Sequence, residues 1–173
     1  MQGKYKAAFF DRDGTIIKDV NYLSSIDQIE LLQQSLAVLQ RCQAQGYKLF
    51  VVTNQSGIAR GFFTEQFVRS THAHLAALFE VHGITFTQWY YCPHHPNAAV
   101  QERYKQNCTC RKPLPGMLLQ AAQDHNLDLS QSLMFGNEPT DLAAGRAAGC
   151  ASLDITTLFS LFSLPPAQCA TLW

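Results

Sequence analysis

The strongest constraint on the fold is a regular alternation of short apolar segments with segments of helical spacing. The apolar segments have the length of buried strands and cover residues 6–10, 47–52, 84–91 and 132–135. The helical segments cover residues 35–45, 64–82, 115–125 and 141–148. Strands that alternate with helices are joined by right-handed crossovers, so the pattern predicts an α/β fold whose mostly parallel sheet carries helices on both faces.

Composition favours a single domain and excludes two classes of partner. The chain has 173 residues without an internal repeat or linker, so we expect one domain over residues 1–173 and a monomer. Thirteen basic residues balance thirteen acidic ones, which argues against nucleic acid or an anionic membrane as a partner. No apolar run reaches the roughly 18 residues of a membrane span, and the N-terminus lacks a secretory pattern, so we expect a cytoplasmic protein.

Polar residues follow the predicted strands at the points where these end. Asp11 and Asp13 follow the first strand, Thr53 and Asn54 the second, and residues 136–138 the fourth. In open α/β sheets, ligands bind beyond the carboxyl ends of the strands. The sequence therefore predicts a binding site at this edge of the sheet.

The segment Asp11-Arg12-Asp13-Gly14-Thr15 is the clearest candidate for chemistry. Two carboxylates at this spacing can face one pocket, while Arg12 points elsewhere or covers the rim. A divalent cation would keep Asp11 ionised as a nucleophile, and Asp13 would act as general acid and then as general base. The alternative is an ordinary loop in which these residues form only a turn and a cap.

This segment resembles the first motif of the haloacid dehalogenase (HAD) superfamily of phosphatases, which form a phosphoaspartate. Two further segments, Thr53 to Gly61 and Cys110 to Met117, together with Cys92-Pro93-His94-His95-Pro96, are similar to the branch of heptose bisphosphatases and histidinol-phosphate phosphatases. The resemblance covers roughly residues 6 to 149. It implies a Rossmann-like HAD fold and a magnesium-dependent phosphomonoesterase that removes the 7-phosphate of D-glycero-D-manno-heptose 1,7-bisphosphate, with histidinol phosphate as the alternative substrate.

The resemblance also implies roles for residues around a small phosphorylated substrate. Thr53 and Lys112 would stabilise the transferred phosphoryl group, since phosphoryl transfer requires positive or hydrogen-bonding groups around three oxygens. Residues assigned to substrate binding are Asp19, Asn21, Tyr22, Asn54, Gln55, Ser56 and Arg111. Taken alone, each residue is better explained by a structural role: Thr53 as a strand end, Lys112 as a solvated charge and Arg111 as a surface ion-pair partner.

Two ligand pairs in the loop of residues 92–110 predict a structural zinc site. Cys92 and His94 form one pair, and Cys108 and Cys110 the other, which gives the four ligands of a closed tetrahedral site. His95 is the rival of His94, and the family pattern favours His94. The alternatives are reduced cysteines or a chance disulfide. The long loop between the pairs favours the heptose bisphosphatases, and its expected role is to hold Arg111 and Lys112 above the site.

The sequence departs from the family at the third metal motif, which usually has an aspartate where this chain has Asn137. We expect Mg²⁺ to be held by Asp11, Asp13 and Asn137, with Glu138 as an alternative carboxylate, and Asp141 to match the motif's later acid. Because an amide brings no charge, the affinity for Mg²⁺ should be lower. The competing interpretation is a phosphate-binding protein that has lost turnover.

Two features of the remaining chain are open to more than one interpretation. Residues 154–173 are expected to form a last strand at most and a packed tail. The cysteines outside the loop, Cys42, Cys150 and Cys169, are expected to be buried or partly buried thiols.

Overall fold

The structure is a computed structural model and describes residues 4–97 and 100–162, so Cys169 and most of the expected tail lie outside the described residues. It contains one parallel sheet with the strand order β3-β2-β1-β4-β5. The strands are β1 (Ala7–Phe10), β2 (Lys48–Asn54), β3 (Phe86–Cys92), β4 (Leu133–Gly136) and β5 (Ala151–Asp154). The predicted α/β fold is confirmed, and β5 adds the closing strand that the sequence left open.

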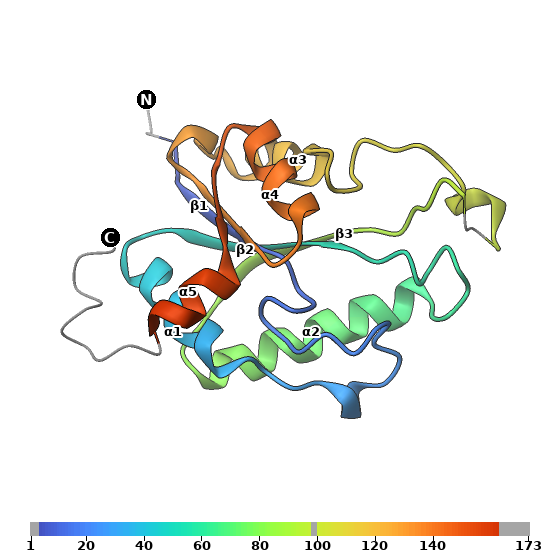
Figure 1. The fold of residues 1–173 in the computed structure, drawn as a ribbon, viewed down its shortest axis with the longest axis horizontal. Coiled ribbons are helices and arrows are strands. Elements are labelled where there is room, and N and C mark those ends of the chain that lie inside the picture. Colours follow the sequence, from blue (N-terminus) through green and yellow to red (C-terminus); the bar gives the residue numbers. More distant parts are fainter. Residues whose placement is uncertain (1–3, 98–99, 163–173) are drawn as a thin grey trace.

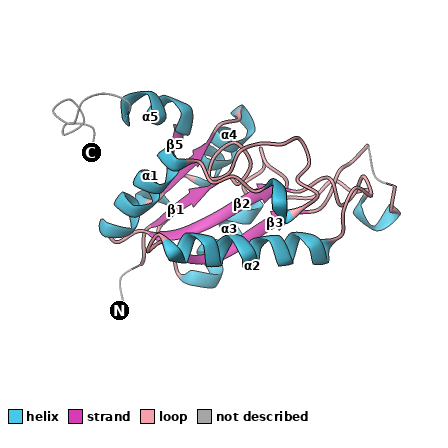
Figure 2. Cartoon of the chain, turned by 90° about the horizontal axis from the view of Figure 1, so that it is seen from below, coloured by secondary structure: helices cyan, strands magenta, loops and turns pink. Residues whose placement is uncertain are grey.

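Helices cover both faces of the sheet, as Figures 1 and 2 show. The helices on one face are α1 (Gln33–Ala44), α2 (Glu65–Val81) and α5 (Ile155–Phe162), and those on the other are α3 (Gly116–His125) and α4 (Pro139–Ala148). Short 3₁₀ helices occupy Ile26–Gln28, Glu102–Tyr104 and Leu129–Gln131. Within the described part of the chain, no helix combines the length and the apolar character needed to cross a bilayer.

The central strands are buried on both faces, which explains why their sequences are apolar without alternation. In β1, Ala8 and Phe10 pack with α1, α2 and α5, whereas Ala7 and Phe9 pack with α3 and α4. All four residues are fully buried. Successive side chains of a strand point to opposite faces, so a strand between two helical layers must be apolar at every position.

The helix ends follow from local capping. The hydroxyl of Thr64 accepts a hydrogen bond from the Phe67 amide and so caps α2. Gly149 ends α4 at φ 89°, a conformation that glycine adopts without a steric penalty. Pro139 begins α4 two residues before the predicted start, because proline lacks an amide hydrogen and fits the first helical turn.

Candidate active site

The carboxyl ends of β1, β2 and β4 meet at one point, and the ammonium group of Lys112 lies there. Its Nζ is 2.6 Å from Asp11 Oδ1, 2.7 Å from Asp141 Oδ1 and 2.7 Å from the Val52 carbonyl oxygen. An ammonium group has three hydrogens, and these three acceptors satisfy all of them. Lys112 therefore links the ends of β1 and β2 to the first turn of α4, and its side chain is only 2% exposed.

The nucleophile candidate Asp11 is fixed by its backbone as well as by Lys112. Its amide donates to the Phe135 carbonyl at 2.9 Å, which continues the pairing of β1 with β4 beyond Phe10. Burial raises the pKa of Asp11, and the charge of Lys112 opposes this effect. Burial would lower the pKa of Lys112, but Asp11 and Asp141 together raise it, so the lysine stays charged.

Asp13 is held by a buried clamp. Arg12 Nη2 donates to Asp13 Oδ2 at 2.9 Å and to Oδ1 at 3.0 Å, and Gln55 Nε2 donates to Oδ2 at 3.0 Å. Burial raises the pKa of Asp13 more than the charge of Arg12 lowers it, and an upward shift is the direction that suits a general acid. The prediction for Arg12 is wrong: at 2% exposure it neither covers the rim nor points away from the carboxylates.

Thr53 and Asn54 lie at the end of β2, as predicted, but they differ in what they contact. Thr53 is buried and accepts a hydrogen bond from Gln55 Nε2 at 2.9 Å. The side chain of Asn54 binds the backbone of Lys112 in both directions, with each hydrogen bond 3.0 Å long. Asn54 thus fixes the loop that carries Lys112, which explains how a loop residue reaches the centre of the site.

Two adjacent cavities open at these strand ends. One, of about 160 Å³, is lined by Asp11, Asp13, Asp19, Thr53, Asn54, Lys112, Asn137, Glu138, Thr140 and Asp141. The other, of about 190 Å³, is lined by Arg12, Asp13, Asp19, Asn21, Tyr22, Leu23, Asn54, Gln55, Ser56, Gly57 and Phe63. They share Asp13, Asp19 and Asn54, so the reacting carboxylates adjoin the predicted substrate-binding residues.

Arg111 is the predicted substrate-binding residue that the structure places apart from this pair of cavities. It lines a third cavity, of about 290 Å³, together with residues of the zinc loop. Its Nη1 donates to the His94 carbonyl oxygen at 3.4 Å. A larger cavity, of about 900 Å³, lies along α3 and includes none of the predicted site residues.

The oxygen atoms around the smaller cavity fit a magnesium ion. Asp11, Asp13 and Asn137 line it, and they offer a carboxylate, a backbone carbonyl and an amide oxygen, which suit the preference of Mg²⁺ for oxygen ligands. Asn137 lies against the turn after Asp13: a β-carbon on Gly14 would be 2.6 Å from Asn137 Nδ2. The Thr15 hydroxyl donates to Asn137 Oδ1 at 3.1 Å. Asn137 therefore lies against the turn that follows Asp13, on the wall of the same cavity.

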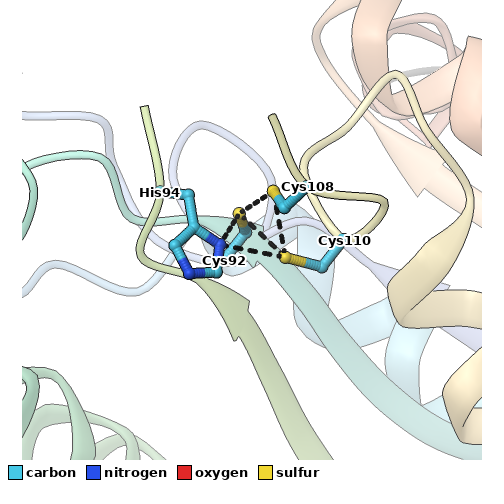
Figure 3. A group of neighbouring side chains, drawn as sticks. All are labelled: Cys92, His94, Cys108 and Cys110. Carbon is cyan, nitrogen blue, oxygen red and sulfur yellow. Dashed lines mark hydrogen bonds between the residues drawn. The ribbon is translucent and has the colours of Figure 1, made fainter. Parts of the chain in front are cut away.

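The four predicted zinc ligands converge where the two ends of the zinc loop, residues 92–110, meet (Figure 3). The ligand atoms of Cys92, His94, Cys108 and Cys110 all lie within 4.8 Å of one another. The sulfur–sulfur distances are 3.1, 3.3 and 3.4 Å, and His94 Nδ1 is 3.5 Å from Cys110 Sγ. A disulfide would need about 2.05 Å. One nitrogen and three sulfur atoms in this arrangement could hold zinc tetrahedrally.

His95, the rival ligand, points into a different environment. Its Nε2 lies 3.3 Å from Arg60 Nη2, and its Nδ1 accepts a hydrogen bond from the Asn97 amide at 3.2 Å.

The zinc loop is also anchored to the first turn of α2. The hydroxyl groups of Tyr91 and Tyr104 donate to the two carboxylate oxygens of Glu65 at 2.7 and 2.5 Å.

Three residues have roles in the site that the sequence does not indicate. Asp141 matches a family motif, but no sequence pattern pairs it with Lys112, to which it lies 2.7 Å away. Its position explains Gly136, because a β-carbon there would be 2.3 Å from Asp141 Oδ2. Arg12 and His72 form a contact of 3.4 Å that no local pattern indicates.

Comparisons with known proteins agree with this geometry. A family model described as HAD-hydrolase-like matches residues 109–157. The D-glycero-β-D-manno-heptose-1,7-bisphosphate 7-phosphatase of Pasteurella multocida is 46% identical over 144 residues, which are 83% of this chain and 77% of the relative. The enzyme of the same name from Haemophilus ducreyi is 45% identical over 145 residues, or 83% and 79% of the two chains.

Solved structures give the same assignment. A HAD-like phosphatase from Mesorhizobium loti superposes with a TM-score of 0.82 at 36% identity and covers 87% of this chain and 72% of the other. The D,D-heptose 1,7-bisphosphate phosphatase of B. bronchiseptica, complexed with magnesium and phosphate, gives a TM-score of 0.76 at 29% identity and covers 93% and 89%. The chain therefore belongs to the family of these heptose bisphosphate phosphatases within the haloacid dehalogenase superfamily.

Proposed function

We propose that this protein is a magnesium-dependent phosphatase that removes the 7-phosphate of D-glycero-D-manno-heptose 1,7-bisphosphate. The observation that carries the proposal is that Lys112 forms ion pairs with both Asp11 and Asp141. Asp13 lines the same cavity as these three residues. The substrate is inferred from relatives at 40–46% identity that bear this name.

The reaction would proceed in two displacements. A carboxylate oxygen of Asp11 attacks the phosphorus in line, the bond to the sugar oxygen breaks, and Asp13 gives its proton to that oxygen. A water molecule then attacks the phosphorus of the aspartyl phosphate and gives a proton to Asp13. Inorganic phosphate leaves and Asp11 is regenerated. Lys112, 2.6 Å from Asp11 before the reaction, and Thr53 at the end of β2 stabilise the negative oxygens.

Two metal ions complete the proposal. Mg²⁺, held by Asp11, Asp13 and Asn137, with Glu138 as the alternative ligand, would offset the charge of the phosphoryl group and the two carboxylates. Zn²⁺ at Cys92, His94, Cys108 and Cys110 would stabilise the loop that ends at Arg111 and Lys112, without activating water.

The second cavity would hold the sugar. Its polar lining comes from Asp19, Asn21, Tyr22, Gln55 and Ser56. Asn21 and Tyr22 adopt positive φ angles of 52° and 72°, so the loop after β1 turns sharply at this wall. We assign Arg111, in the adjoining region, to the part of the substrate distant from the reacting phosphate. Asn54 contributes through the backbone of Lys112.

The test is phosphate release from both anomers of the heptose bisphosphate and from histidinol phosphate, with the Asp11→Asn variant as control. We expect magnesium-dependent release from the heptose ester, and loss of activity with retained zinc content in the variant. Preferred hydrolysis of histidinol phosphate would overturn the substrate. The uncharged Asn137 keeps one rival function open, a phosphate-binding protein without turnover. A burst of aspartyl phosphate at Asp11 in the wild type excludes this rival.

A further inference from the structure

A buried chain of polar contacts runs from α2 to the carboxylate of Asp13. Its members are His72, Arg12 and Gln55, whose exposed fractions are 5%, 2% and 3%. Within the described residues, the side-chain hydrogen bonds of these three residues go to groups other than Asp11, the reacting carboxylate. Arg12 heads the set of largest fully buried side chains in the described protein. Burial of a guanidinium group destabilises the folded protein by several kcal/mol unless its hydrogens are paired. The burial of Arg12 therefore requires a physical explanation.

The contacts of Arg12 account for its burial and restrict its orientation. Nε and Nη2 both donate to the Asp13 carboxylate, and Nη2 donates to Gln55 Oε1 at 3.0 Å. Gln55 in turn donates to Asp13 Oδ2 at 3.0 Å, which closes a ring of three side chains. The guanidinium group is planar and rigid, so a fork fixed in this way also fixes the plane of the carboxylate.

His72 supplies the acceptor behind this ring. Its Nε2 lies 3.4 Å from Arg12 Nη1, and its ring packs against Trp89 and Tyr91 of β3 at centroid distances of 5.0 and 5.8 Å. Burial and the positive charge of Arg12 lower the pKa of His72 to about 3, so the imidazole is neutral and can accept from the guanidinium group. Without the imidazole, Arg12 Nη1 would lose the hydrogen-bond acceptor that His72 Nε2 provides in this buried position.

We propose that Arg12, backed by His72, is a positioning residue that holds the carboxyl group of Asp13 in the orientation required to protonate the leaving oxygen. The inference rests on the proposed phosphatase function, because it assigns a support to that function's general acid. Proton transfer by a positioned side chain contributes roughly 10²–10⁴-fold to a rate, and it depends on hydrogen-bonding distance to the acceptor atom.

The leaving group distinguishes this role from a general structural one. A sugar alkoxide is strongly basic and needs the proton of Asp13, whereas 4-nitrophenolate is weakly basic and needs it much less. The constant kcat/KM reports the steps up to the first release of product, so it excludes the later hydrolysis of aspartyl phosphate. Misplacement of Asp13 should therefore reduce kcat/KM for the heptose ester far more than for 4-nitrophenyl phosphate.

The experiment compares four variants, one of them a control, with the wild type on these two esters. His72→Phe keeps the ring packing but removes the acceptor, and Arg12→Lys keeps the charge but removes the fork. Both should lower kcat/KM for the heptose ester by roughly tenfold or more, and for the aryl ester by a much smaller factor. His72→Gln restores an acceptor and should recover most of the lost activity. Thr71→Val, which changes a buried hydroxyl without a partner in the described structure, is the matched control on α2.

Each outcome decides the question. Equal losses on both esters in His72→Phe and Arg12→Lys would reduce these residues to a structural role and overturn the inference, as would no loss on either. A wild type that hydrolyses neither ester would overturn the phosphatase function together with this role. A wild type that is active on both, with Asp11→Asn inactive and an unchanged ratio in the variants, would overturn the positioning role alone.

Discussion

Lys112 Nζ lies 2.6 Å from Asp11 Oδ1, and both side chains are almost fully buried. The same ammonium group is 2.7 Å from Asp141 Oδ1, so one positive charge serves two buried carboxylates. The charge of Lys112 opposes the effect of burial on the pKa of Asp11 and so favours its ionised form. It also makes Lys112 a residue on which both activity and stability depend.

Replacement of Lys112 by Met should therefore be costly in two ways. Breaking a buried ion pair by removing one partner destabilises a protein by about 3–5 kcal/mol, because the remaining charge is uncompensated. Loss of a group that stabilises the phosphoryl oxygens should lower kcat by about a hundredfold or more. Urea unfolding and steady-state kinetics measure the two effects. Lys18→Met, which breaks an exposed pair with Glu30, should change both far less, and equal effects would contradict this account.

Asn137→Asp should increase the apparent affinity for magnesium. The variant adds a negative charge beside Gly14 and Thr15, where the amide of Asn137 now lies, and Mg²⁺ is held by few protein ligands, so one charge matters. Activity measured as a function of magnesium concentration should saturate at a lower concentration, with the same reaction product. Gln123→Glu adds the same charge on the outer side of α3 and is the control. An unchanged magnesium dependence in Asn137→Asp would contradict the assignment of this residue.

The fold and the residues at the strand ends could be predicted because both follow from the pattern of residues within short segments of the sequence. A run such as Ala7–Phe10 is apolar at every position only when both faces are buried, and this identifies a central strand. Parallel strands end at the same edge, so Asp11, Thr53 and Asn137 had to converge once the strands were recognised. The cluster of Cys92, His94, Cys108 and Cys110 was predictable from two pairs of residues, each closely spaced in the sequence.

The rest of the site depends on contacts between distant segments, which no local pattern specifies. Arg12 and His72 are separated by 60 positions, and their contact follows from how α2 packs on β3. Asn54 illustrates a second difficulty: an amide that contacts substrate and one that fixes a backbone have the same sequence signature. Only the structure shows that its side chain binds the backbone of Lys112.

Removal of zinc should impair substrate binding and stability, although the zinc cluster is separate from the reacting carboxylates. Cys108→Ser removes one ligand of the cluster, so zinc content measured by atomic emission should fall. The loop that leads to Lys112 would then lose a constraint, so KM should rise and the melting temperature should fall. Cys150→Ser alters a buried thiol outside the cluster and should retain zinc. Full zinc content in Cys108→Ser would contradict the assignment of Cys108 as a ligand.

The buried histidine predicts a dependence of stability on pH. The pKa of His72 is about 3 in the folded protein and near 6.5 when the chain is unfolded, so the unfolded chain alone takes up a proton between these values. The free energy of unfolding therefore falls as the pH drops below about 6.5, and His72→Gln removes this contribution. Urea unfolding should show that the stability difference between wild type and variant changes by about 1 kcal/mol from pH 6.5 to 5.5, in favour of the variant at the lower pH. Other titrating groups cancel in this difference. Thr71→Val should show a constant difference over the same range, and a constant difference in His72→Gln would mean that the imidazole is not held neutral by its surroundings.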